Sequence, residues 1–168
     1  FDKFLKDNEI LYFGSLKLKV LQTPGHTPAC SSYLFNDKHL FTGDALFMPD
    51  YGTGRCDFPL GSSRDLFNSI KNKIYKLSDN VIYYTAHDYL PKNRKLKYKA
   101  KLKESKEKNI QLNEKTTEKD FINFRNKRDK KLDAPKLLLP SLQVNIQGGA
   151  LPEKESNNIR YLKIPITE

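Results

Sequence analysis

The sequence contains no apolar run that approaches the roughly 18 residues of a membrane-spanning helix, so it predicts a soluble chain without a membrane partner. It has only two cysteines, Cys30 and Cys56, and neither belongs to a CxxC pair. This argues against a disulfide framework and favours the reducing cytoplasm. The chain starts at Phe1 rather than methionine and shows no secretory signal. We therefore expect a cytoplasmic chain that is part of a longer protein.

Positive charge, in contrast, is plentiful, with a formal net charge of +10 over 168 residues. Residues 92–131 contain 16 Lys and Arg against 6 Asp and Glu, so this segment carries the whole excess. A basic segment can bind nucleic acid or an anionic surface, which is one alternative function. However, its only aromatic residues are Tyr98, Phe121 and Phe124, and Lys-rich helices are usually solvated faces. Nucleic acid is therefore not the expected partner.

The apolar periodicity predicts strands alternating with helices. Strands are predicted at residues 16–21, 31–35, 39–42 and 81–85, and again in the apolar segments 137–146 and 161–166. Helices are predicted from Ser62 or Ser63 to residue 77, over about 95–109, and over about 117–132. The segment 45–61 lies between the predicted strand 39–42 and the predicted helix that begins at Ser62 or Ser63. It is rich in Gly and Pro, which is typical of a long loop that serves a site.

Few residues could hold a metal, since the sequence has only three histidines. His26 lies in a Gly- and Pro-flanked loop, Asp44 ends the hairpin of residues 31–42, and His87 directly follows the strand 81–85. Imidazole and carboxylate together suit Zn²⁺ or Fe²⁺. From spacing alone, metal ligation competes with a structural role for His26 and Asp44. His39 follows a polar turn and is expected to be structural, and Cys56 is expected to be an inert loop cysteine.

Three segments resemble the metallo-β-lactamase superfamily in their order and approximate separations: 23–28 (TPGHTP), 41–46 (FTGDAL) and 86–89 (AHDY). The resemblance implies a mixed α/β (α+β) fold, of which this chain is the C-terminal part of an αββα sandwich. Residues 1–98 would be the second half of the core, with the metal ligands. Residues 99–168 would add family-specific C-terminal helices and terminal strands to the same domain. The family's first metal motif, His-x-His-x-Asp-His, is expected to precede Phe1.

Within the superfamily, the segments 54–58 (GRCDF) and 87–89 (HDY) resemble the persulfide (sulfur) dioxygenases rather than glyoxalase II. The pairs Phe124-Arg125 and Arg128-Asp129, together with the segments 137–146 and 161–165, resemble a bacterial branch of β-lactamase hydrolase-like proteins. The resemblance implies an enzyme of sulfide detoxification that oxidises glutathione persulfide, or a similar small-molecule persulfide, with O₂ to sulfite. It implies one Fe²⁺ per chain. The sequence leaves a homodimer open.

The resemblance also assigns the metal ligands. His26 and Asp44 match two of the three iron ligands of the dioxygenases, and the third is a histidine of the first motif. His87 matches a residue that binds the second metal in two-metal hydrolases but lies beside the iron in the dioxygenases. The alternative is therefore a thioester hydrolase of the glyoxalase II type, with two Zn²⁺, in which Asp44 bridges the metals and His87 is a ligand.

Substrate-binding residues follow from the same resemblance. Arg55, Asp57 and Tyr89 match positions around the glutathione pocket, where Arg could pair with a carboxylate and Tyr could donate a hydrogen bond. An ion pair between Arg55 and Asp57 could instead brace the loop. No catalytic residue beyond the metal ligands is implied.

Overall fold

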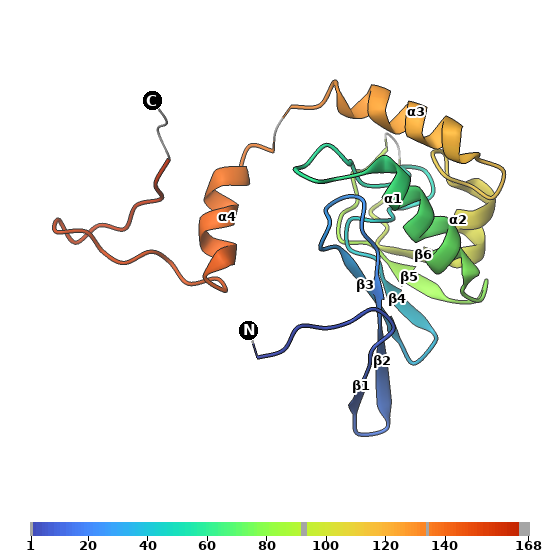
Figure 1. Ribbon diagram of the computed structural model, residues 1–168, viewed down its shortest axis with the longest axis horizontal. Coiled ribbons are helices and arrows are strands. Elements are labelled where there is room, and N and C mark those ends of the chain that lie inside the picture. The colour runs from blue at the N-terminus through green and yellow to red at the C-terminus, as the bar shows by residue number, and fades with distance from the viewer. Residues whose placement is uncertain (1, 92–93, 134, 165–168) are drawn as a thin grey trace. The chain divides into compact units, whose positions relative to one another are not determined.

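The computed structural model describes residues 2–91, 94–133 and 135–164, which form two compact units (Figure 1). The first unit, Phe1–Lys131, contains every hydrophobic side chain that is buried among the described residues. The second unit is Leu132–Glu168. In neither unit does a described helix have the length and the apolar character that a membrane span requires.

The first unit is built on a mixed sheet whose strands neighbour one another in chain order. The strands are β1 (Ile10–Phe13), β2 (Leu16–Gln22), β3 (Ser31–Phe35), β4 (His39–Phe41), β5 (Ile82–Tyr84) and β6 (Lys99–Lys101). Strand β3 runs antiparallel to both β2 and β4, and β5 runs parallel to β4. The carboxyl ends of β2, β4 and β5 therefore lie at one edge of the sheet, and the loops that leave these ends meet there.

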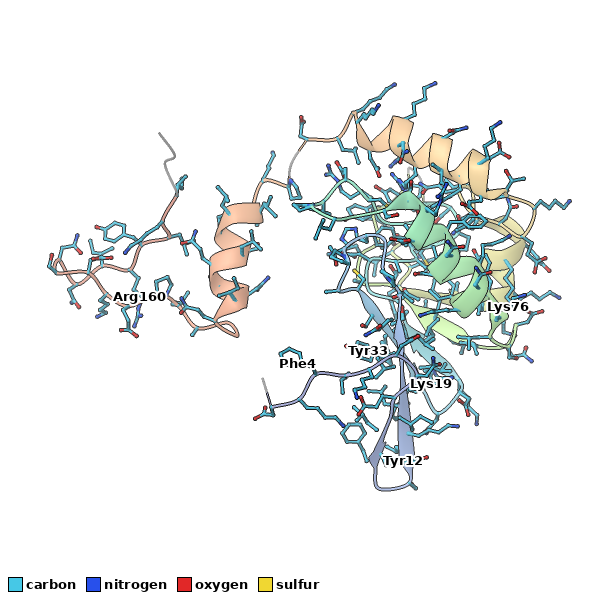
Figure 2. The ribbon with its side chains drawn as sticks, viewed as in Figure 1. Phe4, Tyr12, Lys19, Tyr33, Lys76 and Arg160 are labelled. Atoms are coloured by element: carbon cyan, nitrogen blue, oxygen red, sulfur yellow. The ribbon has the colours of Figure 1, made fainter. Side chains whose placement is uncertain are left out.

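Both faces of this sheet are apolar. On one face Leu40 and Tyr83 lie side by side and are fully buried in the hydrophobic core. On the other face Tyr33, Phe41 and Tyr84 lie in cross-strand register, and the rings of Phe41 and Tyr84 stack with 5.2 Å between centroids (Tyr33 is labelled in Figure 2). Apolar residues on both faces are typical of a sheet that is covered on both sides.

Helices cover the face that carries Leu40 and Tyr83. They are α1 (Ser63–Asn68), α2 (Leu102–Lys108) and α3 (Glu118–Asp129). Helix α1 begins after Ser62, whose side chain accepts a hydrogen bond from the backbone N–H of Asp65 at 3.1 Å. It continues through a π-helical turn, Ser69–Lys73, and a 3₁₀ turn, Ile74–Lys76. This path buries Leu66, Ile70 and Ile74 completely.

Most predicted elements are confirmed. The predicted strands at 16–21, 31–35, 39–42 and 81–85 correspond to β2, β3, β4 and β5. Helix α3 begins at the predicted Thr117, whose hydroxyl oxygen accepts from the backbone N–H of Asp120 at 3.2 Å. Phe121 anchors this helix in the core.

The helix predicted over about 95–109 is wrong in its first half. Residues Lys99–Lys101 form β6, and α2 begins only at Leu102. Ala100 lies opposite Tyr83 of β5, and its two neighbours Lys99 and Lys101 are exposed. The strand exists because β5 offers its backbone groups at the sheet edge, and this pairing overrides the helical preference of a Lys- and Ala-containing segment.

The strand predicted within 137–146 is also wrong, because the second unit contains a helix there, α4 (Leu138–Ile146). Leucine is a good helix former, and Pro140 lies in the first turn of α4, where its missing N–H costs little. Residues 161–164 form no strand, although the side-chain amide of Gln143 makes two hydrogen bonds of 2.7 Å to the backbone of Lys163. The last two residues of the predicted strand 161–166 lie outside the described residues.

Candidate metal centre

Three side chains gather where β2, β4 and β5 end. His26 lies in the loop after β2, Asp44 follows β4, and His87 follows β5. The Oδ2 atom of Asp44 is 3.5 Å from Nε2 of His26, and its Oδ1 atom is 3.4 Å from Nε2 of His87. The structure thus brings together the three residues that the sequence analysis singled out. The remaining histidine, His39, instead contacts the hydroxyl of Tyr84 at 3.2 Å.

The ring of His26 is fixed by its surroundings. Gly25 has a φ of +138°, and a Cβ there would lie 2.3 Å from the backbone nitrogen of Leu66, so only glycine permits this approach to α1. Nδ1 of His26 is 2.6 Å from the carbonyl oxygen of Arg55. Because a carbonyl oxygen only accepts, Nδ1 carries the donated proton. Nε2, which faces Asp44, therefore has a free lone pair in the neutral ring, as a metal-ligating histidine requires.

Asp44 is held in a tight turn. The hydroxyl of Thr42 donates to the carbonyl oxygens of Leu46 at 2.8 Å and Tyr84 at 3.1 Å. Among the described residues, no group donates a hydrogen bond to the buried Oδ1 atom of Asp44. A buried carboxylate oxygen without a donor is costly unless positive charge compensates it. A cation between Asp44 and Nε2 of His26 would satisfy two acceptors that otherwise face one another.

The residues present therefore fit a metal ion in their chemistry, since imidazole nitrogen and carboxylate oxygen suit both Zn²⁺ and Fe²⁺. Within residues 2–91, 94–133 and 135–164, however, no group of three or more His, Cys, Asp and Glu side chains is arranged to hold a metal by itself. The chain instead offers two pairs that share Asp44, one with His26 and one with His87. Each pair would need further ligands. The assignment of these residues as ligands stays a prediction.

The loop 53–58 packs against the first of these pairs. A Cβ on Gly54 would lie 2.0 Å from the carbonyl oxygen of Asp44, and the ring of Phe58 contacts His26 edge-on, with 5.0 Å between centroids. In the same loop Arg55 donates two hydrogen bonds of 2.5 Å to the carboxylate of Asp57. These bonds lower the pKa of Asp57 and raise that of Arg55. The bracing ion pair considered from the sequence is thus present beside the candidate metal ligands.

Cys56 lies in the same loop and is buried. Its thiol has a pKa raised to about 12, chiefly because burial disfavours the thiolate. A thiol of this kind is protonated at physiological pH and is a poor nucleophile. The structure therefore gives Cys56 the surroundings of a packing residue rather than of a reactive one.

Tyr89 belongs to an aromatic group beside His87. Its ring stacks on Tyr51 with 4.7 Å between centroids and meets Phe47 edge-on at 5.4 Å, and 5.6 Å separates it from the His87 ring. Partial burial, together with the negative charge of Asp44, raises the pKa of Tyr89. Its hydroxyl is therefore protonated at neutral pH and able to donate a hydrogen bond at the edge of the site.

The role of the groups that hold these loops in place was not predicted from the sequence. Arg94 pairs with the buried carboxylate of Asp88 at 2.6 Å and with Asp50 at 2.5 Å, which ties the segment after β5 to the loop after β4. On α3, Arg125 and Asp129 form a buried ion pair that contacts the loop 53–58. A signal for the second pair was present, because Phe121, Arg125 and Asp129 recur every four residues and share one face of a predicted helix.

Sequence comparisons place these features in a known group. The family model described as the metallo-beta-lactamase superfamily matches residues 2–87. Glyoxylase B2 of Dictyostelium discoideum is 48% identical over 166 residues, which cover 99% of this chain and 56% of that protein. A beta-lactamase hydrolase-like protein of Xylella fastidiosa is 43% identical over 165 residues, 98% of this chain and 38% of that protein.

Proteins named ETHE1 are also similar. Human mitochondrial persulfide dioxygenase ETHE1 is 39% identical over 89 residues, which cover 52% of this chain and 34% of that protein. The crystal structure of ETHE1 from Myxococcus xanthus superimposes with a TM-score of 0.74 and 32% identity, covering 87% of this chain and 60% of the other. The chain spans less than two thirds of the length of each of these four proteins.

The mixed sheet with its helical layer matches the metallo-β-lactamase fold, and the predicted mixed α/β class is confirmed. The chain belongs to the metallo-β-lactamase superfamily. Members of this superfamily are metal-dependent enzymes that hold metal ions in their active sites. The resemblance to β-lactamase hydrolase-like and ETHE1 proteins is confirmed as well.

Proposed function

We propose that the protein is an iron-dependent persulfide dioxygenase that oxidises glutathione persulfide, or a similar small-molecule persulfide, with O₂ to sulfite. His26 and Asp44 would supply two ligands of a single Fe²⁺. The dioxygenases that the sequence resembles take their third ligand from a His-x-His-x-Asp-His motif, which these 168 residues do not contain. When bound, the iron would supply the activation of the persulfide sulfur and of O₂.

The proposal is supported above all by the position of residues 54–58. This is the GRCDF segment by which the sequence resembles the dioxygenases, and it lies directly against the His26–Asp44 pair. Residues suited to bind the substrate therefore adjoin the atoms suited to bind the metal. The similarity to ETHE1 of M. xanthus, which extends over 87% of this chain, supports the same choice.

Five residues of this chain have a defined role in this proposal. Asp44 would contribute a full negative charge to the metal, and His26 a neutral nitrogen of fixed tautomer. Arg55, oriented by Asp57, would place positive charge where a carboxylate of glutathione can bind. Tyr89, beside His87, would donate a hydrogen bond to the bound substrate.

A thioester hydrolase of the glyoxalase II type is the second candidate, because Asp44 turns one carboxylate oxygen toward each histidine. This is the arrangement that a carboxylate needs to bridge two metal ions. In such an enzyme His87 would be a ligand, and two Zn²⁺ would supply an activated water for thioester cleavage. The similarity to glyoxylase B2, which covers 99% of this chain, supports this candidate.

Metal analysis of the full-length protein, as its gene encodes it, separates the two functions. The dioxygenase requires one iron per chain and oxygen uptake on addition of glutathione persulfide. Two zinc ions per chain, with cleavage of a glutathione thioester and no oxygen uptake, would reject it in favour of the hydrolase.

The substitution Asp44→Ala should abolish both metal retention and turnover. Asp37→Ala is its matched control, because Asp37 is an exposed turn carboxylate paired with Lys17 and belongs to neither pair of candidate ligands. Full activity of the Asp44→Ala protein would reject both functions.

A further inference from the structure

Helix α3 buries a charged pair that the proposed function does not use. Arg125 is 1% exposed and Asp129 is 4% exposed, and both lie one and two helical turns beyond Phe121 on the buried face of the helix. Burying two charges is costly, and replacing such a pair by apolar residues is often neutral or stabilising. Stability alone therefore does not explain why this pair is buried here.

The pair forms hydrogen bonds with the backbone of the loop 53–58 at two points. Nη1 of Arg125 donates to the carbonyl oxygen of Thr53 at 3.2 Å and to the side-chain oxygen of Gln111 at 2.9 Å. Both carboxylate oxygens of Asp129 accept from Arg125: Oδ1 accepts from Nη2 at 2.6 Å and from Nε at 3.0 Å, and Oδ2 accepts from Nε at 3.1 Å. Oδ2 also accepts from the backbone N–H of Cys56 at 2.8 Å.

The hydrogen bond between Asp129 and the Cys56 N–H is connected to His26 through one peptide group. The N–H of Cys56 and the C=O of Arg55 belong to the same peptide unit, which is planar and trans, so they point in opposite directions. The N–H is bound by Asp129, and the C=O accepts the Nδ1 proton of His26 at 2.6 Å. A carboxylate on one side of a peptide polarises it and strengthens the acceptor on the other side.

We propose that Arg125 and Asp129 are positioning residues that hold His26 in the tautomer with the proton on Nδ1, acting through the peptide between Arg55 and Cys56. The inference rests on the proposed function only in treating His26 as a metal ligand. Metal-bound histidines commonly donate their second nitrogen to a carboxylate or a carbonyl. Here the carboxylate acts one peptide further away, and Arg125 fixes its orientation while compensating its charge.

Long-range ¹H–¹⁵N correlation spectra of the metal-free 168-residue chain test this directly, because the two tautomers give different nitrogen shifts. At about pH 8.5 imidazoles of ordinary pKa are neutral. Only three histidines contribute, and His26→Gln identifies the signals of His26. We expect wild-type His26 to be predominantly protonated on Nδ1. His39, which contacts the Tyr84 hydroxyl in another part of the sheet, is an internal reference.

The decisive variant is Asp129→Asn, which keeps the size of the side chain. The amide keeps one acceptor oxygen, but it is uncharged and its NH₂ group is a donor, so it cannot reproduce the two-oxygen pairing with Arg125 together with the bond to the Cys56 N–H. We expect His26 to shift toward a mixture rich in the Nε2-protonated form. Asp129→Glu keeps two acceptor oxygens and should retain more of the wild-type tautomer. A folded Asp129→Asn chain with the wild-type tautomer of His26 would overturn the proposal.

Two further variants separate positioning from simple bracing. Asp79→Asn removes a carboxylate from the ion pair with Lys106 on α2, where the Lys106 side chain is 9% exposed, and should leave the His26 signals unchanged. Arg125→Lys keeps the charge but loses the forked geometry, and should shift the tautomer as Asp129→Asn does. If both Asp129→Asn and Arg125→Lys fail to fold, the pair is structural and the proposal is rejected.

Metal affinity distinguishes this proposal from the proposed function. In the full-length protein, Asp129→Asn should weaken metal binding by about ten- to hundredfold, which is typical for the loss of a group that orients a ligand. A full-length wild-type protein that binds no metal would reject the proposed function, while the tautomer measurement on the metal-free chain would still decide the role of Arg125 and Asp129.

Discussion

Position 54 shows how closely backbone atoms approach the candidate metal ligands. A Cβ on Gly54 would lie 2.0 Å from the carbonyl oxygen of Asp44 and 3.2 Å from Nδ1 of His26. We expect Gly54→Ala to separate the two loops, at a cost of roughly 1–3 kcal/mol in the free energy of unfolding, and to lower the metal content of the full-length protein. Urea unfolding and metal analysis measure the two effects.

The control for this prediction is Gly14→Ala. Gly14 lies in the turn between β1 and β2 with a φ of +61°, and a Cβ there would meet no atom within 4 Å. Alanine at this φ costs about 1–2 kcal/mol through backbone strain alone. Gly14→Ala should therefore be destabilised with its metal content intact. Wild-type metal content in Gly54→Ala would show that the close approach is unimportant for the site.

A second prediction concerns the pH dependence of the Arg55–Asp57 pair. The hydrogen bonds from Arg55 place the pKa of Asp57 below its value in the unfolded chain, which is about 3.9. A group with a lowered folded-state pKa stabilises the fold above the unfolded value, and this contribution is lost as the pH falls through the folded value. The stability difference between wild type and Asp57→Asn should thus be constant near pH 7 and decrease below about pH 4. Urea midpoints between pH 7 and 3 provide the measurement, and an undiminished difference at pH 3 would contradict the assignment.

At the scale of elements, the sequence predicts those segments whose apolar residues already define one face. Leu66, Ile70 and Ile74 recur every four residues, and the structure buries all three along α1 and the turns that extend it. Local periodicity is sufficient in this case because the element has one clearly apolar side.

Elements that depend on distant partners could not be predicted in this way. Lys99–Lys101 has no apolar alternation, and only its pairing with β5 makes it a strand. The candidate site likewise contains residues that local motifs predict and contacts that they do not. His26, Asp44 and His87 stand in recognisable motifs, whereas the contact between Asp129 and the Cys56 N–H joins residues 73 positions apart. Such a contact follows from how α3 packs, which no local pattern specifies.

Helix α3 carries the next prediction, because its N-terminus depends on one hydroxyl. The side chain of Thr117 caps the backbone N–H of Asp120 at 3.2 Å. Thr117→Ala should cost about 1 kcal/mol in the free energy of unfolding, whereas Thr117→Ser keeps the hydroxyl and should remain within a few tenths of wild type. Urea unfolding of the three proteins decides the matter. Equal losses in the alanine and serine variants would mean that the threonine methyl group, rather than the cap, is responsible.

At the scale of the whole molecule, part of the positive charge of residues 92–131 is used inside the fold. Arg94 pairs with Asp50 and Asp88, and Arg125 pairs with Asp129. These cations hold loops and helices together rather than forming a surface for an anionic partner.

The last prediction concerns the division of the chain into Phe1–Lys131 and Leu132–Glu168. Every buried hydrophobic side chain of the described residues lies between Val20 and Phe121, and α4 has no buried residue. A chain that ends at Lys131 should therefore unfold cooperatively, with a free energy within about 0.5 kcal/mol of the 168-residue chain, as for changes outside the core.

A chain that ends at Thr116 is the matched comparison, since it also lacks α3. It loses Phe121 from the core and leaves the Cys56 N–H and the Thr53 carbonyl without Arg125 and Asp129. Removing these groups combines a core cavity with unsatisfied buried polar atoms, so the loss should exceed about 4 kcal/mol and abolish cooperative unfolding. Circular dichroism during urea unfolding compares the two chains. If the chain that ends at Lys131 is also unfolded, Leu132–Glu168 must contribute packing on which the sheet depends, and the boundary of the folded unit lies further along the sequence.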